Sequence, residues 1–141
     1  MRNSYKVGII VGTYNSEKYI IPLLLFFQQL TFNHHIEKIV FVDSAPTDKT
    51  VDLLKEYKKD SHNSHDINIL RLNANKCYAY CLNQGIDAFG QDLPNYLLFS
   101  NADVIYPPHY LDDLFEELKG YESCNIGIVG SSVLVPIDKE K

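Results

Sequence analysis

Short runs of consecutive apolar residues alternate along the chain with segments whose apolar residues recur at helical spacing. The first run, Lys6–Gly12, has the length and continuity of a strand that is buried on both faces. Similar runs predict further strands at residues 38–43, 67–72, 96–100 and 126–135. Because strands and helices alternate, we expect right-handed βαβ units, which build a mainly parallel sheet. The pattern therefore predicts an α/β fold.

Each segment between two predicted strands carries an apolar stripe with the spacing of a helix. Asn15 or Ser16 is expected to cap the first helix, and Thr47 or Asp48 the second. Pro22 would loosen the start of the first helix or kink it. The residues expected to face the core are Ile20, Leu23, Leu24, Phe27 and Leu30, then Val51, Leu54 and Tyr57, then Tyr78, Leu82, Ile86 and Phe89, and last Leu111, Leu114, Phe115 and Leu118.

The bulk properties narrow the class of protein. A length of 141 residues suits one domain, residues 1–141. The net charge of −5 argues against nucleic-acid binding, because phosphate contacts need clustered Lys and Arg. We expect a cytoplasmic protein, because the sequence has neither a membrane-length apolar run nor a signal-peptide core. Its 3 cysteines suit a reducing compartment better than a disulfide framework.

Polar residues follow each of the first four predicted strands, at positions 13–15, 43–48, 73–76 and 101–103. In an open α/β sheet the ligand binds beyond the carboxyl ends of the strands. Asp43 and Asp103 would therefore lie at one edge of the sheet. A single Asp at a strand end serves a turn or cap about as often as it serves a ligand, but four polar strand ends favour a ligand site.

Asn101 and Asp103 are separated by one small residue, Ala102. In an extended loop their side chains would point the same way. Two oxygen ligands on one side suit Mg²⁺ or Mn²⁺, which would also bind diphosphate oxygens and water. The alternative is a turn in which Asn101 bonds its own backbone, and the spacing leaves both interpretations open.

Four segments, in this order, resemble motifs in the N-terminal half of the family 2 inverting glycosyltransferases, which have the GT-A fold. Residues 7–15 are similar to the first strand and Thr-Tyr-Asn loop of that family, and residues 42–50 to its V-D-D-G-S-x-D-x-T segment. Residues 75–86 resemble its N-x-G-x-A-x-A-x-N-x-G-I stretch, and residues 98–104 the L-F-L-N-P-D-V form of its D-x-D motif, found in rhamnosyltransferase-like members. The resemblance covers nearly the whole chain. It implies a GT-A fold, a Rossmann-like three-layer α/β/α arrangement that is truncated here.

The resemblance implies transfer of a sugar from a nucleoside diphosphate sugar to a glycan or lipid-linked acceptor, as in cell-wall or polysaccharide biosynthesis. Thr13, Tyr14 and Asp43 would contact the base and ribose. Asp103, helped by Asn101, would hold a divalent cation, Mn²⁺ or Mg²⁺, on the diphosphate, where it offsets charge on the leaving group. The full set of implied donor-binding residues is Thr13, Tyr14, Asn15, Asp43, Lys76, Asn101, Ala102 and Asp103.

The sequence departs from the family pattern at several of these positions. Ser44 replaces the second Asp of V-D-D, and Ala45-Pro46 replaces Gly-Ser. Ala45 is expected to be extended, because proline disfavours helical geometry in the residue before it. Cys77 replaces a Gly, and Asn101 replaces the first Asp of D-x-D, which weakens metal binding.

The family's acceptor-binding half, with the catalytic base, is expected beyond Lys141. An inverting transfer needs a base to deprotonate the acceptor, and we identify none in this sequence. We favour a fragment of a longer enzyme over one half of a split enzyme. A non-catalytic nucleotide-binding or interaction module derived from a glycosyltransferase is the alternative function. The resemblance leaves open a peripheral membrane association of the full-length protein.

Other notable residues favour structural roles. Cys77 and Cys81 lack the second ligand pair of a zinc site and are expected in or near the core. Tyr78 and Tyr96 are likewise expected in the core. A receiver-like signalling domain is a weaker hypothesis, because it would need acidic residues after the first strand.

Overall fold

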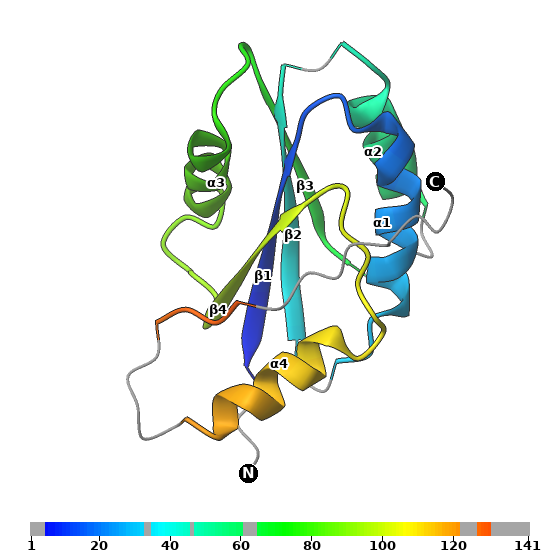
Figure 1. Cartoon of the computed structure of the whole chain (residues 1–141). Helices are drawn as coiled ribbons and strands as arrows, with labels where there is room; N and C mark the ends of the chain where they lie inside the picture. Colours follow the sequence, from blue (N-terminus) through cyan, green and yellow to red (C-terminus); the bar gives the residue numbers. More distant parts are fainter. Residues whose placement is uncertain (1–4, 33–34, 46, 61–64, 122–126, 131–141) are drawn as a thin grey trace, which may run out of the picture.

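The computed structural model of the protein describes residues 5–32, 35–45, 47–60, 65–121 and 127–130. The elements are β1 (Lys6–Thr13), α1 (Glu17–Gln29), β2 (His35–Ser44), α2 (Thr50–Lys59), β3 (Ile67–Leu72), α3 (Tyr78–Asp87), β4 (Tyr96–Asn101) and α4 (Tyr110–Lys119). The four strands pair in parallel in the order β3-β2-β1-β4 (Figure 1). The predicted α/β fold with a parallel sheet is confirmed.

The boundaries of the elements follow the sequence pattern, with a few differences. β2 begins at His35 instead of Lys38, and α4 begins at Tyr110 because the preceding residues form a turn. α1 continues through Pro22, which lies on its exposed side. The strand predicted at 126–135 lies mostly outside the described residues, and its described part, 127–130, has no regular secondary structure. In the described part of the chain, no helix is long and apolar enough to cross a membrane.

Helices cover both faces of the sheet, as the three-layer prediction required. Figure 1 shows α3 on one side of the sheet and α1 and α2 on the other. Side chains alternate along β1, so that Val7, Ile9 and Val11 pack in the larger core with α1 and α2, while Ile10 packs in the smaller core with α3. The larger core also contains Leu23, Phe27, Phe41, Leu54, Ala102, Tyr106 and Phe115.

α3 lies unusually close to the sheet because glycines form the contact. A Cβ on Gly85 would lie only 2.3 Å from Cγ2 of Ile10, and a Cβ on Gly12 would lie 2.7 Å from the Tyr78 ring. The two buried residues of α3 are Cys81 and Gly85, and Leu82 and Ile86 pack against the same core. The predicted inward stripe is confirmed for Leu82, Ile86 and Phe89, which pack in the smaller core. It is wrong for Tyr78, which is 45% exposed although one side of its ring packs on Gly12.

Two further core predictions are corrected by the structure. Tyr96 is 39% exposed, although its ring contacts those of Tyr5 and Phe115. Cys77 precedes α3 and is exposed, whereas Cys81 is buried as expected. Neither change affects the strand ends, which hold the candidate site.

Candidate functional site

The carboxyl ends of three neighbouring strands bring together predicted site residues from distant parts of the sequence. Thr13 of β1 lies beside Asp43 of β2, and Gly12 lies beside Asn101 of β4. Because neighbouring strands are about 4.8 Å apart, the backbones at Asp43 and Asn101 are about 10 Å apart across β1. This edge is where a ligand of an open α/β sheet binds.

Asp43 is a completely buried carboxylate, with 0% of its surface exposed. The Thr13 hydroxyl donates a hydrogen bond of 2.7 Å to Oδ1, while Oδ2 has no hydrogen-bond partner among the described residues. Burial raises the pKa of Asp43, although the hydrogen bond from Thr13 opposes the increase. A ligand could reach this carboxylate only if the surrounding loops moved, so its contact with a nucleotide stays a prediction.

Ser44 connects β2 to the loop before α3. Its Oγ accepts a 2.6 Å hydrogen bond from the backbone N–H of Lys76 and lies 3.1 Å from Oδ1 of Asn75. Ser44, which replaces the second Asp of the family pattern, therefore binds the loop between β3 and α3. Lys76 itself is exposed, with its Nζ 5.7 Å from the centre of the Tyr80 ring, and its role with the donor stays a prediction.

Ala45 has a left-handed backbone, with a φ of 51°. The expectation of an extended Ala45 is therefore wrong. The turn is closed by a hydrogen bond of 3.1 Å from the Ala45 N–H to the carbonyl of Asp43, which outweighs the local preference set by the following proline. A left-handed conformation costs a non-glycine residue about 1–2 kcal/mol, so the chain keeps here the geometry for which the family pattern uses Gly.

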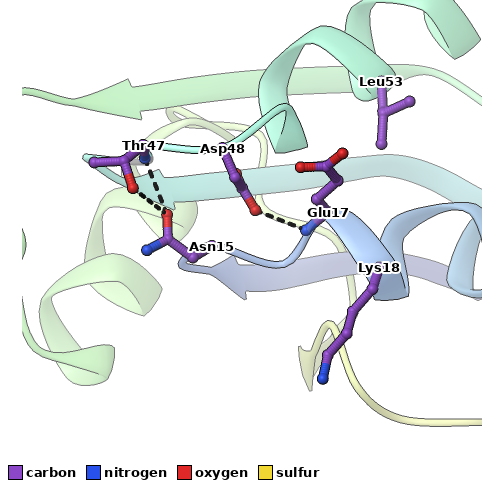
Figure 2. A pocket seen from close by; sticks show the side chains of 6 residues that line it. All are labelled: Asn15, Glu17, Lys18, Thr47, Asp48 and Leu53. Carbon is purple, nitrogen blue, oxygen red and sulfur yellow. Dashed lines mark hydrogen bonds between the residues drawn. The ribbon is translucent and has the colours of Figure 1, made fainter.

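The loop after β1 is fastened to the loop after β2. Asn15 also has a positive φ, of 48°, and its Oδ1 accepts hydrogen bonds of 2.9 and 3.2 Å from the N–H and hydroxyl of Thr47 (Figure 2). Tyr14, in contrast, is largely exposed. Asn15 thus has a structural role that the sequence did not reveal, and contacts of Asn15 and Tyr14 with a ligand stay predictions.

Asp48 ties together the first turns of α1 and α2. Its Oδ2 accepts from the N–H of Glu17 at 2.9 Å and its Oδ1 from the N–H of Thr50 at 3.0 Å (Figure 2 shows the bond to Glu17). Burial tends to raise the pKa of Asp48, but these hydrogen bonds outweigh it and leave the pKa lowered. The predicted cap of α1 from Asn15 or Ser16 is wrong, since Asn15 accepts from Thr47 and the Ser16 hydroxyl contacts Tyr14. The amide of Glu17 at the start of α1 is capped by Asp48.

A shallow depression of about 630 Å³ adjoins this network, lined by Asn15, Glu17, Lys18, Thr47, Asp48 and Leu53. Figure 2 shows the carboxyl groups of Asp48 and Glu17 near the starts of α1 and α2, with Asn15 beside Thr47. The carboxylates already occupy the helix N-termini that would otherwise attract a phosphate. We therefore place the candidate site at the strand ends, where the other predicted residues lie.

Asn101 and Asp103 are both exposed, whereas Ala102 between them is buried in the larger core. An amide and a carboxylate are suitable oxygen ligands for Mg²⁺ or Mn²⁺, which bind through one or two protein ligands when substrate phosphates supply the others. Among the described residues, no group of three or more His, Cys, Asp or Glu side chains could hold a metal alone. The loop therefore fits a cation that is shared with a diphosphate.

Three residues around this loop were not predicted to matter. At the end of β4, Ser100 accepts hydrogen bonds from the hydroxyls of Tyr78, on its backbone carbonyl, and of Tyr106, on its side-chain oxygen. They are 22 and 6 residues from one another along the chain, so no periodicity connects them. The one indication in the sequence was a polar residue, Ser100, at the last-but-one position of a strand whose preceding residues are apolar.

Comparison with known families assigns the chain. The model described as glycosyl transferase family 2 matches residues 8–134, and the chain belongs to this family. The recognition made from four sequence motifs is therefore confirmed.

The chain is similar in sequence to two characterised glycosyltransferases. It is 29% identical over 125 residues to poly(ribitol-phosphate) beta-N-acetylglucosaminyltransferase TarS of Staphylococcus aureus, an alignment that covers 82% of the chain and 21% of TarS. It is 35% identical over 80 residues to dolichyl N-acetyl-alpha-D-glucosaminyl phosphate 3-beta-D-2,3-diacetamido-2,3-dideoxy-beta-D-glucuronosyltransferase of Methanococcus voltae, covering 57% of the chain and 24% of that protein. The chain thus spans about a fifth to a quarter of the length of these relatives.

Solved structures agree with the fold. The structure of S. aureus TarS residues 1–349 in complex with UDP matches with a TM-score of 0.67 and 26% identity, over 82% of this chain and 32% of that one. The mannosyltransferase PcManGT of Pyrobaculum calidifontis matches with a TM-score of 0.71 over 89% of this chain and 35% of that one. Its identity is 22%, so this likeness shows the GT-A fold alone.

Proposed function

We propose that residues 1–141 bind the nucleoside diphosphate sugar in a longer inverting glycosyltransferase that acts on a glycan or lipid-linked acceptor. The observation that carries this proposal is the meeting of Thr13, Asp43 and the Asn101–Asp103 loop at the carboxyl ends of three adjacent strands. A UDP-bound relative at 26% identity supports the class of donor. The acceptor class is supported by TarS, whose name describes transfer to a poly(ribitol-phosphate).

Each part of the site has a distinct task in this proposal. Asp103 and Asn101 hold a divalent cation together with the diphosphate. The bound cation supplies Lewis-acid stabilisation of the charge on the departing nucleoside diphosphate. Lys76, in the loop between β3 and α3, adds positive charge beside the diphosphate, while Tyr14 and Asp43 recognise the nucleoside. The base that deprotonates the acceptor is assigned to the acceptor-binding part of the full-length enzyme.

Thermal unfolding of the chain with UDP, dTDP or GDP, each with and without Mn²⁺, tests the proposal. A nucleotide at about 100 times its Kd adds about 2.7 kcal/mol of stability by linkage. For a chain of this size, about 3 °C per kcal/mol converts this gain to roughly 8 °C in Tm. We expect Mn²⁺ to be required for most of the shift.

The variant Asp103→Ala should abolish the Mn²⁺-dependent shift. Asp92→Ala is the matched control, because Asp92 is also exposed but precedes β4, at the opposite edge of the sheet. It should leave the shift unchanged. Absence of metal-dependent binding for every nucleotide tested would refute donor binding and favour a non-catalytic interaction module.

A further inference from the structure

Ser100 is the centre of a hydrogen-bonded cluster that holds the backbone immediately before Asp103. The hydroxyl of Tyr106 donates to Ser100 Oγ at 2.6 Å, and Ser100 Oγ donates to the carbonyl of Asn101 at 2.9 Å. The hydroxyl of Tyr78 donates to the carbonyl of Ser100 at 3.2 Å. Each hydroxyl donates once, so all three bonds can exist at the same time.

Two members of the cluster are buried. Ser100 is 3% exposed and Tyr106 is 5% exposed. The Tyr106 ring lies nearly parallel to Phe27, with ring centres 6.2 Å apart, and 4.7 Å from the ring of Tyr110. Burial raises the pKa of Tyr106 to about 12, so its hydroxyl keeps its proton and remains a donor at neutral pH.

Burial of Ala102 and Tyr106 determines which residues of the Asn101–Asp103 loop face solvent. Ala102 and Tyr106 belong to the larger core, whereas Asn101 and Asp103 are exposed on either side of Ala102. Tyr78 adds a connection from the start of α3, across the end of β1, where its ring packs on Gly12. The loop is thus fixed to the core and to a helix on the other face of the sheet.

This arrangement coincides with two departures from the L-F-L-N-P-D-V pattern. Ser100 stands where that pattern has Leu, and Ala102 where it has Pro. Proline would restrict the backbone of the loop covalently by fixing φ, and Leu could not form the bonds that Ser100 forms. In this chain, hydrogen bonds to Ser100 supply a restriction that the loop otherwise lacks.

We propose that Ser100, Tyr106 and Tyr78 are positioning residues that hold Asn101 and Asp103 in the geometry that binds a divalent cation together with a nucleoside diphosphate. The inference rests on the function proposed above. Residues that orient metal ligands through hydrogen bonds contribute about 10–100-fold to metal affinity. The cluster thereby favours metal binding by a pair of ligands in which one carboxylate has been replaced by an amide.

Tyr106→Phe and Ser100→Ala each remove one hydroxyl from the full chain and preserve most of the packing. We would measure the affinity for Mn²⁺ in the presence of UDP by electron paramagnetic resonance, and the affinity for UDP in EDTA by calorimetry. Each variant should weaken Mn²⁺ binding about tenfold and leave metal-free UDP binding unchanged. Tyr78→Phe should have a smaller effect, because its bond is longer and the side chain is half-exposed.

Tyr57→Phe is the matched control. It removes a hydroxyl that is hydrogen-bonded to Gln28 from a half-buried tyrosine of α2, a helix that does not contribute to the loop. It should not change the affinity for Mn²⁺. Normal Mn²⁺ affinity in Tyr106→Phe and Ser100→Ala would overturn the positioning role alone, as would an equal loss in Tyr57→Phe. Absence of UDP and Mn²⁺ binding in the unmodified chain would overturn the proposed function itself.

Discussion

Replacement of Gly85 by alanine tests whether α3 is held in direct contact with the sheet. The new Cβ would lie 2.3 Å from Cγ2 of Ile10, which is fully buried on β1. Cγ2 is bonded directly to the Cβ of a β-branched residue, so it cannot move aside without a change of rotamer or backbone. Overpacking of this kind costs about 3 kcal/mol, at the upper end of its usual range, and the better helix propensity of alanine returns about 1 kcal/mol. We therefore expect a net loss of about 2 kcal/mol.

Urea denaturation would measure this loss as a fall of about 1 M in the midpoint, given an m-value of about 2 kcal/mol/M. Asn83→Ala is the control, because Asn83 is exposed on the same helix, and it should change stability by less than about 0.5 kcal/mol. The double variant Ile10→Ala/Gly85→Ala should lose less stability than the two single variants lose together, because the space left by the Ile10 side chain accommodates the new Cβ at position 85. An unchanged or higher midpoint in Gly85→Ala would refute the close contact.

Three further predictions concern the loops at the strand ends. Asp48→Ala should lower stability by about 1–2 kcal/mol at pH 7, because the carboxylate caps two helices. Since the folded-state pKa of Asp48 is lowered, this contribution is present above the unfolded pKa of about 3.8 and disappears as the pH falls through the folded value. A difference between variant and wild type that stays constant down to low pH in urea titrations would contradict this assignment. The pKa of Asp43 is raised, mainly by burial, so the stability of the unmodified chain should fall as the pH rises from about 3.8 through the folded-state pKa. Asp43→Asn should remove this fall, and an unaltered pH profile of stability in that variant would contradict the prediction. Ala45→Gly should stabilise the chain by about 0.5–1 kcal/mol, since relief of the left-handed backbone exceeds the added entropy of the unfolded chain, and a lower Tm would show that the backbone there is not strained.

The alternation of strands and helices was predictable because burial on two faces of a parallel sheet leaves a direct trace in the sequence. β1 and β3 were predicted to within one residue for this reason. The face of α3 was predicted only in part: Leu82, Ile86 and Phe89 pack in the smaller core, but the closest contact with the sheet is made by Gly85, to which apolar periodicity gives no weight. The general rule is that a stripe of small residues can displace larger ones from a helix–sheet contact.

The site was predictable at the level of topology but not of hydrogen bonding. Parallel strands bring their carboxyl ends to one edge, so the placement of Asp43 and the Asn101–Asp103 loop at the same edge was predicted, whereas the strand order was not. The left-handed Ala45 was not predictable from local preferences, because a backbone bond to Asp43 outweighed them. The Ser100 cluster was also beyond the sequence, since it joins side chains from a strand, a loop and a helix on the opposite face.

The two carboxylates predicted to share this edge have opposite surroundings, and the contrast separates their roles. Asp103 is exposed and needs no compensation, whereas Asp43 is fully buried with one oxygen left unpaired among the described residues. A neutral side chain could accept the hydrogen bond from Thr13 without the cost of burying a charge. A ligand N–H on Oδ2 would offset that cost. Relative to the unmodified chain, Asp43→Asn should therefore be more stable at neutral pH than at acid pH, and it should lose affinity for the nucleoside. If Asp43→Asn bound UDP with Mn²⁺ as tightly as the unmodified chain while Asp103→Ala did not, the role of the Asp43 side chain would be limited to its hydrogen bond with Thr13.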